Sequence, residues 1–233
     1  MPDETEPGIV ALHLKRYEFA LPWCRDRDVL DAGCGVGYGT AALAQAAASV
    51  VGVDRDGSAI AYARERYGAP NVEFRTGDLL DLDLPDESFD TVCSFETIEH
   101  LADLDRYLRE MTRVLRTEGV YVVSTPQVAR TTDTPDNPFH HVELARADFE
   151  ALLRRHFDEV ELYGQRRLQT ARHRLALRLD VLGLRRRLSF LRPAGRLLGT
   201  APMAEVALEG IAIERDELER ATELVAVCRS PRR

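Results

Sequence analysis

Segments with the pattern of short buried strands alternate with segments of helical periodicity through the first 165 residues of the chain. Strands are expected at 28–31, 49–54, 71–75, 89–95, 119–124 and 157–163, and helices at 38–48, 58–67, 104–115 and 147–156. Strands and helices that alternate in this way form a parallel sheet with helices on both faces. The sequence therefore predicts an α/β fold with a doubly wound, mostly parallel sheet, to which 223–229 adds a last strand.

The last third of the chain departs from this pattern. Between Arg166 and Arg196, ten arginines stand against one acidic residue, Asp180, and leucines are interleaved with them. The whole chain carries a net charge of −8 and this segment +9, so the remainder of the chain is strongly acidic. We predict a single domain, 1–233, with an Arg-rich helical insertion at 164–218. Three roles stay open for it: helices facing the protein's own acidic surface, binding of an anionic acceptor or RNA, and a homodimer or membrane-surface contact.

Composition and cysteine spacing limit how the chain can be stabilised and where the protein is expected in the cell. With 45% hydrophobic residues among 233, the chain can bury a core without disulfide bonds or a structural metal. The four cysteines show no CxxC spacing, the acidic N-terminus lacks the layout of a signal peptide, and the longest apolar stretch, 41–53, is too short to cross a bilayer. We therefore expect a cytoplasmic protein without an integral membrane segment.

A glycine-rich turn follows the first expected strand, with glycines at positions 33, 35, 37 and 39. Glycines allow a nucleotide-like cofactor to approach the backbone closely. The turn is not the dinucleotide motif GxGxxG, because the sixth position is Tyr38 counted from Gly33 and Thr40 counted from Gly35. This difference argues against a nicotinamide oxidoreductase.

Acidic residues follow the next two strands. Asp54 ends the second strand, where a carboxylate can accept hydrogen bonds from both ribose hydroxyls of an adenosine-bearing cofactor. Asp78 and Leu79 follow the third strand, at the neighbouring part of the same rim. Each acid could simply form a turn, but together and in this order they indicate a cofactor site.

Five segments resemble the successive motifs of class I S-adenosylmethionine-dependent methyltransferases. They read DAGCGVGYGT at 31–40, VGVD at 51–54, GDLLDLDLP at 77–85, FDTVCSFETIEHL at 89–101 and VLRTEGVYVVSTP at 114–126. The resemblance covers about 29–163, and 223–229 is similar to the family's final strand. It implies a Rossmann-like sheet in the order 3-2-1-4-5-7-6 with strand 7 antiparallel, and S-adenosylmethionine as cofactor. The cofactor contacts it implies are Tyr17, Asp31, Gly33, Gly35, Gly37, Asp54, Asp78, Leu79 and Phe95.

A second motif, Glu96-Thr97-Ile98-Glu99-His100, directly follows the strand at 89–95. In a helical turn, Glu96, Glu99 and His100 would share one face and could hold a divalent cation. Carboxylates favour Mg²⁺ or Mn²⁺, and imidazole shifts the preference toward Mn²⁺, Fe²⁺ or Zn²⁺. The ExxEH pattern is similar to two metal-dependent branches of the family, the ubiquinone-pathway O-methyltransferases and the small-RNA 3′-terminal 2′-O-methyltransferases. Other members carry Glu-His here without a metal.

The loop after the fifth strand contains two neighbouring histidines. In the RNA branch, a histidine three residues before a glutamate at the start of the next helix completes the metal site, and Glu143 selects His140 over His141 for that role. The resemblance therefore implies the metal ligands Glu96, Glu99, His100 and His140. The alternative for His140 is a hydrogen bond that fixes the loop.

These residues favour O-methylation. An alcohol is a poor nucleophile until its proton leaves, and a metal lowers the pKa of the hydroxyl and fixes its direction. His140 or His100 could take the proton as catalytic base. We predict that the acceptor is the hydroxyl of a sugar or oligosaccharide.

Several alternatives stay open. The acceptor could be a phenolic quinone precursor or an RNA 2′-hydroxyl, although the acidic charge and the 7% aromatic content argue against a nucleic-acid partner. From other classes, the chain could be a nicotinamide oxidoreductase or a non-catalytic nucleotide-binding protein.

Overall fold

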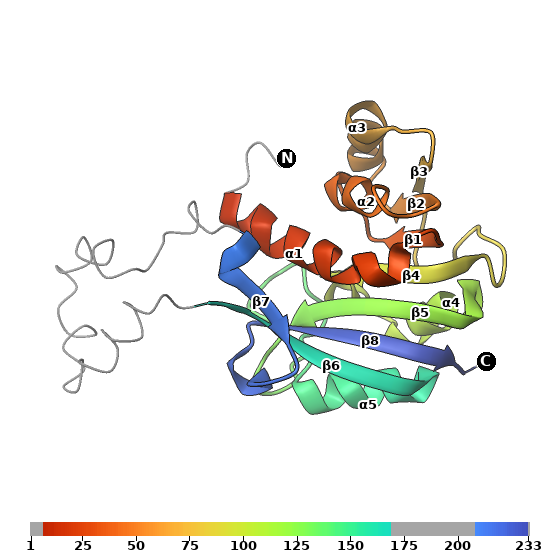
Figure 1. Cartoon of the computed structure of the whole chain (residues 1–233). Helices are drawn as coiled ribbons and strands as arrows, with labels where there is room; N and C mark the ends of the chain where they lie inside the picture. The colour runs from red at the N-terminus through yellow and green to blue at the C-terminus, as the bar shows by residue number, and fades with distance from the viewer. Residues whose placement is uncertain (1–6, 169–207, 233) are drawn as a thin grey trace, which may run out of the picture.

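The computed structural model describes residues 7–168 and 208–232. Its helices are α1 (Pro7–Cys24), α2 (Tyr38–Leu43), α3 (Gly57–Tyr67), α4 (Leu104–Val114) and α5 (Arg146–His156), with short 3-10 helices at Ile98–His100, Leu208–Gly210 and Leu218–Arg220. Its strands are β1 (Asp28–Ala32), β2 (Ser49–Asp54), β3 (Val72–Thr76), β4 (Phe89–Phe95), β5 (Leu115–Pro126), β6 (Phe157–Arg167), β7 (Ile211–Glu214) and β8 (Glu223–Pro231). Figure 1 shows these strands in one twisted sheet.

The strand order is β3-β2-β1-β4-β5-β8-β6-β7. β1 to β5 pair in parallel, whereas β8 runs antiparallel to both of its neighbours, β5 and β6. This confirms the predicted α/β fold, and the first seven positions reproduce the implied order, with β8 as the antiparallel strand. The implied count of seven is one short within the described residues, because β7 adds an antiparallel edge strand along β6.

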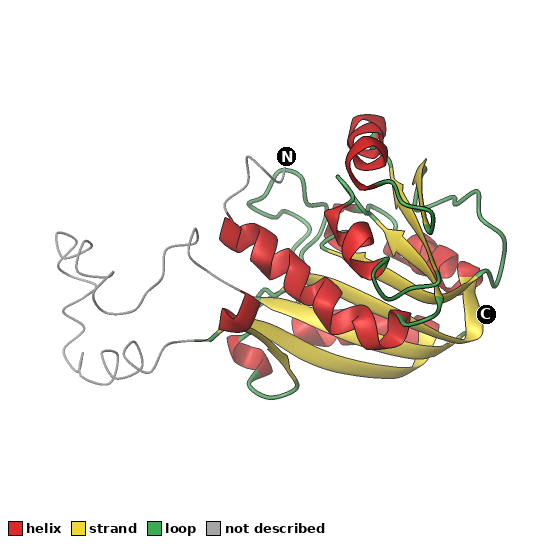
Figure 2. Ribbon diagram, turned by 45° about the horizontal axis from the view of Figure 1, so that its top comes forward, coloured by secondary structure: helices red, strands yellow, loops and turns green. Residues whose placement is uncertain are grey.

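Helices cover both faces of the sheet (Figure 2). Neighbouring residues of β5 point to opposite faces, so Tyr121 and Val123 join one apolar cluster while Val122 joins another. The first cluster contains the buried apolar residues of α4 and α5, and the second contains Tyr17, Ala20 and Cys24 of α1 and Leu43 of α2. No helix among 7–168 and 208–232 has the length and apolar character needed to cross a membrane.

The ends of several elements differ from the predictions. The helix expected at 38–48 ends at Leu43, and β5 begins four residues before the expected start at 119. Residues 164–167 belong to β6 and 211–214 to β7, so the segment predicted as a helical insertion at 164–218 contains strand near both of its ends. Its central part, 169–207, lies outside the described residues, and most of the arginine cluster lies there.

Gly39 illustrates how closely α1 approaches α2. A Cβ atom at this position would overlap the ring of Tyr17. We expect Gly39→Ala to lower the free energy of unfolding by about 1–3 kcal/mol, because the buried ring has to move. Urea denaturation measures the change.

Gly57→Ala is the matched control, since the nearest atom to a Cβ there lies 3.9 Å away. We expect its stability to be unchanged or slightly higher. Equal losses for the two variants would contradict this account of the contact between α1 and α2.

Candidate active site

A cavity of about 820 Å³ lies where strands β1, β2 and β4 end. Ligands bind at this edge in open α/β sheets, and the volume falls within the range of small-molecule sites. The predicted contacts that line it are Tyr17, Gly33, Gly35, Asp54, Asp78, Leu79 and Phe95. Asp31 and Gly37 are the two predicted contacts that do not.

The turn after β1 uses its glycines for different purposes. Gly33, Gly35 and Gly37 have φ values of +85°, +52° and +86°, a region that favours glycine. A Cβ at Gly35 would project into open space, so the backbone there is accessible to a ligand. At Gly37 it would lie 2.6 Å from Ala63, so this glycine is required for packing against α3.

Asp54 holds this turn. One carboxylate oxygen accepts a hydrogen bond from the backbone N–H of Gly35 at 2.8 Å, and the other accepts one from the N–H of Asp56 at 2.9 Å. The carboxylate also borders the cavity. Asp54 thus joins the end of β2 to the glycine turn and leaves further lone pairs for a ligand.

Asp31 lies beneath the cavity and is fully buried. It accepts hydrogen bonds from Thr40 Oγ1 at 2.6 Å and from the Tyr17 hydroxyl at 3.3 Å. The Tyr17 ring in turn packs edge-on against Phe95, with 4.9 Å between ring centroids. Asp31 therefore orients Tyr17 and α2, where the sequence predicted a direct cofactor contact.

Asp31 also predicts a pH dependence. Burial raises the pKa of its carboxyl group from 3.8 to about 7, although hydrogen bonds from Thr40 and Tyr17 lower it. In the unfolded chain this carboxyl group loses its proton at a lower pH than in the folded protein. The stability that Asp31 contributes is therefore fully present below its unfolded pKa and is lost as the pH rises toward 7. We expect Tyr17→Phe to raise this pKa further, as followed by a carbon-13 NMR titration of the carboxyl group.

Tyr38→Phe removes a comparable hydroxyl and serves as the control, because the Tyr38 hydroxyl bonds to His13 and not to Asp31. A pKa of Asp31 that changes equally in both variants would refute the assigned hydrogen bond.

Asp78 and Leu79 lie at the neighbouring rim, as predicted. The Asp78 carboxylate accepts a hydrogen bond from the N–H of Leu80 at 2.9 Å, which fixes the turn after β3. Leu79 is buried and joins the core beneath the rim. Together they give this end of the cavity an acidic group beside an apolar surface.

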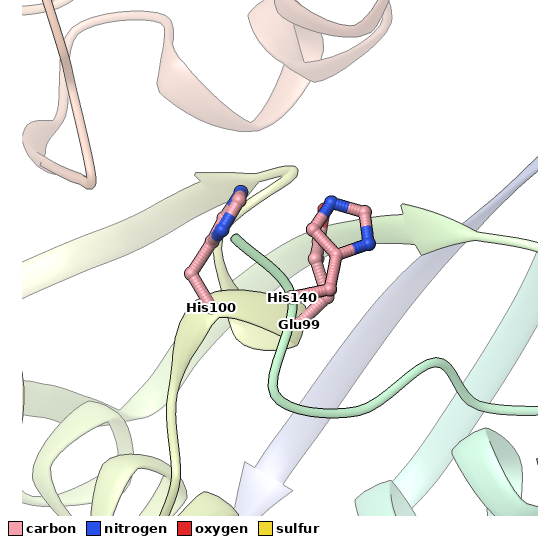
Figure 3. Close-up of side chains that lie close together, drawn as sticks. All are labelled: Glu99, His100 and His140. Carbon is pink, nitrogen blue, oxygen red and sulfur yellow. The ribbon is translucent and has the colours of Figure 1, made fainter. Parts of the chain in front are cut away.

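Three predicted metal ligands come together at the other end. Glu99, His100 and His140 each offer one ligand atom, and these atoms lie within 4.8 Å of one another. Figure 3 shows that Glu99 and His100 come from the turn after β4 and His140 from a separate loop. The two imidazole rings meet edge to face, with 4.8 Å between centroids.

The hydrogen bonds of the two histidines assign their nitrogens. His100 Nδ1 donates to the carbonyl oxygen of Phe139 at 2.8 Å, which leaves Nε2 as the lone-pair nitrogen in the neutral ring. His140 Nδ1 lies 2.7 Å from the Glu143 carboxylate, and its Nε2 lies 2.9 Å from the side-chain nitrogen of Asn137. His100 borders the cavity and His140 lies behind it.

Glu99 is the buried member of this group. Burial raises the pKa of its carboxyl group to about 8, and the neighbouring charge of Glu96 adds to the effect. Its side chain accepts a hydrogen bond from Thr125 at 3.2 Å. Its backbone carbonyl accepts bonds from the N–H groups of His141 and Val142, at 2.7 and 3.3 Å, which dock the histidine loop onto the turn.

Glu96 is not one of the three residues whose ligand atoms converge, although its charge acts on Glu99. The expected helical face from Glu96 to His100 is not formed, because Glu96 has φ +51° and the 3-10 helix begins only at Ile98. Its carboxylate accepts a hydrogen bond from Ser124 Oγ at 2.8 Å and lies 3.6 Å from Arg16 Nη2. The structure thus gives Glu96 other partners than the predicted cation site.

The sequence interpretation gave no individual role to several neighbours of the site, although His13 and Arg16 stand with Tyr17 in a segment that resembles the N-terminal helix covering the cofactor in some family members. Arg16 is 1% exposed and lies between Glu96 and Glu223, and His13 borders the cavity from the same helix. Burial and the Arg16 charge lower the pKa of His13 to about 4. Phe139 also borders the cavity and is 77% exposed. The resemblance of this segment to a cofactor-covering helix was the available sequence signal for His13 and Arg16.

Comparison with known proteins agrees with this geometry. Residues 30–123 match the family described as "Methyltransferase domain". A Mycolicibacterium smegmatis protein named "probable S-adenosylmethionine-dependent methyltransferase" is 47% identical over 168 residues, covering 68% of this chain and 65% of that protein. A ubiquinone biosynthesis O-methyltransferase of Bradyrhizobium sp. is 36% identical over 99 residues, covering 42% and 39% respectively.

A solved structure supports the same fold. The S-adenosylmethionine-dependent methyltransferase of Thermotoga maritima, described as a possible histamine N-methyltransferase, superposes with a TM-score of 0.66 at 17% identity, covering 98% of this chain and 95% of that one. Sheet order and cavity therefore define a Rossmann-like methyltransferase fold. Residues 30–123 therefore form a methyltransferase domain, and the chain is similar to proteins named as S-adenosylmethionine-dependent methyltransferases. The chain spans 65% and 52% of the first two curated relatives.

Proposed function

We propose that the protein is an S-adenosylmethionine-dependent O-methyltransferase that acts on a hydroxyl group of a sugar or oligosaccharide with the help of Mg²⁺ or Mn²⁺. The observation that carries the proposal is the convergence of Glu99, His100 and His140 beside the cavity formed by the glycine turn. A neutral amine would need no such group, whereas a hydroxyl has to lose its proton.

The cavity fits the cofactor in shape and charge. The open backbone at Gly35 admits close approach, and the carboxylates of Asp54 and Asp78 suit a ligand with ribose hydroxyls and an adenine amino group. Tyr17 and Phe95 close the other side with aromatic surface. Asp31 would act through Tyr17.

The three converging side chains fit a divalent cation. One carboxylate and two imidazoles suit Mn²⁺ at least as well as Mg²⁺. Glu99, His100 and His140 would hold the ion, with His140 Nε2 exchanging its bond to the Asn137 amide for the ion and Glu143 orienting the ring through Nδ1. When bound, the cation would lower the pKa of the acceptor hydroxyl.

The same hydrogen bonds favour one histidine as the proton acceptor. His100 borders the cavity and its Nε2 is the free lone-pair nitrogen, whereas both nitrogens of His140 have partners. Phe139 and Glu143 hold the two rings in place, so the direction of proton transfer is set before the acceptor binds. The one lone pair of His100 Nε2 can either hold the cation or take the proton, so His100 would serve as base where Glu99 and His140 hold the ion without it.

A methyl-acceptor screen tests the proposal. Radiolabelled S-adenosylmethionine would be offered with glucose, catechol, fatty acids, histamine and short RNA, in Mg²⁺ or Mn²⁺ and in EDTA. We expect transfer to the saccharide, loss of transfer in EDTA, and recovery when the cation is added back. Transfer to catechol alone would favour the phenolic alternative, which the similarity to the ubiquinone biosynthesis O-methyltransferase also supports. Chelator-insensitive transfer to histamine would overturn the proposal.

A further inference from the structure

We propose that Glu96 binds the acceptor and selects molecules with two neighbouring hydroxyl groups, instead of serving as a cation ligand. This inference rests on the proposed O-methyl transfer and names the residue that would set its acceptor class. It starts from two properties of Glu96, its backbone conformation and its side-chain partners.

The backbone of Glu96 is strained at the edge of the cavity. A φ of +51° is unfavourable for a residue with a Cβ, and such conformations persist where the surrounding structure imposes them. Here the N–H of Glu96 donates to the carbonyl oxygen of Ser124 at 3.3 Å and to its Oγ at 3.2 Å. The turn of the chain leaves Glu96 outside the 3-10 helix that carries Glu99 and His100.

The side chain is supported from behind and open in front. Ser124 Oγ donates to one carboxylate oxygen at 2.8 Å, and Arg16 Nη2 lies 3.6 Å from the other. The Arg16 side chain is 2% exposed, whereas that of Glu96 is 19% exposed and borders the cavity. A carboxylate has about four lone-pair directions, so two hydrogen bonds from a ligand can be accepted in addition to these contacts.

Arg16 also explains why Glu96 would stay in this position. Arg16 is buried, and its Nε and Nη1 have no hydrogen-bond partner among the described residues. Its other acidic neighbour is Glu223, at 3.8 Å. If Glu96 turned to a cation, the buried guanidinium would lose one of these two carboxylates, which is strongly unfavourable.

The chemistry of this arrangement is selective. A carboxylate accepts one hydrogen bond on each oxygen from a pair of neighbouring hydroxyls, as carboxylates do with a ribose. A single alcohol can use only one of these bonds. Glu96 would therefore favour a sugar ring over a molecule with one hydroxyl.

The test separates acceptor binding from cation binding in the protein saturated with S-adenosylhomocysteine. Saturation-transfer NMR would measure binding of glucose, which has neighbouring hydroxyls, and of cyclohexanol, which has one. Calorimetry would measure binding of Mn²⁺. We expect Glu96→Gln to weaken glucose binding about tenfold or more and to leave cyclohexanol and Mn²⁺ within about twofold. Glu99→Gln should instead weaken Mn²⁺ binding about tenfold or more and leave glucose binding within about twofold.

Ser124→Ala provides a second variant, which keeps the charges of Glu96 and Arg16. It removes the hydrogen bond that orients the Glu96 carboxylate and should reduce glucose binding about threefold, again without changing Mn²⁺ binding. If Glu96→Gln fails to fold, Ser124→Ala tests whether glucose binding depends on the Glu96 carboxylate.

Three results would overturn the inference: wild-type protein that does not bind glucose, variants that bind glucose normally, or a tenfold loss of Mn²⁺ binding in Glu96→Gln. Glucose binding that depends on Glu96, in a protein that methylates no hydroxyl, would refute the proposed function and not this inference. Saccharide methylation with an unchanged acceptor KM in Glu96→Gln would refute this inference alone.

Discussion

Asp54→Ala is expected to lower the affinity for S-adenosylhomocysteine by about 100- to 10,000-fold. Two hydrogen bonds to a carboxylate contribute about 1.5–3 kcal/mol each, and 1.4 kcal/mol corresponds to a tenfold change. The same carboxylate fixes the Gly35 backbone, so the substitution also loosens the turn on which the ligand rests. Titration calorimetry measures the change.

Two further variants divide this effect. Asp54→Asn keeps one oxygen acceptor and should lose less affinity than alanine. Asp56→Asn is the control, because Asp56 caps α3 through bonds to the N–H groups of Ser58 and Ala59 and asparagine caps equally well. Affinity within about threefold of wild type in Asp54→Ala would exclude this residue from the cofactor site.

Glu99→Gln and His140→Ala are each expected to lower methyl transfer by on the order of 100-fold in saturating Mg²⁺ or Mn²⁺. Glu99→Gln replaces a carboxylate by a neutral amide and His140→Ala removes an imidazole, each at one of the three side chains that converge beside the cavity. Added cation should fail to restore the activity, while affinity for S-adenosylhomocysteine stays within about twofold. Initial rates over a cation titration provide the measurement.

His141, the neighbour of His140, provides the control for His140→Ala. His141→Gln keeps the backbone N–H that bonds to the Glu99 carbonyl and removes only an imidazole outside the converging group. We expect its apparent cation constant to match that of the wild type. If His140→Ala and His141→Gln respond to the cation identically, His140 is a loop-fixing residue and not a ligand.

The cofactor end of the site was predictable because its signals are local. Asp54 ends a short apolar strand, Gly35 belongs to a glycine-rich turn, and parallel strands bring both to one edge of the sheet. Gly37 stays a predicted cofactor contact, and its packing against α3 was not predictable, because glycines that meet a ligand and glycines that meet a neighbouring helix have the same signature in a sequence.

The rest depended on features that a sequence pattern does not encode. Helical spacing predicted one face for Glu96 and Glu99, but the positive φ of Glu96 turns the chain before the 3-10 helix begins. β7 pairs with β6 across a long separation in the chain, so its four residues left no local signal. The burial of Arg16 likewise depends on contacts between α1 and distant strand ends.

The docked histidine loop has a consequence for kinetics. Its contacts with the turn after β4 use backbone groups and His100 Nδ1, so the loop is held without the atoms that would bind a cation. The entropy lost on ordering the loop is therefore part of folding and not of cation capture. Ion uptake would then be governed by the release of water from the ion, which Mg²⁺ undergoes reluctantly, and not by closure of a loop.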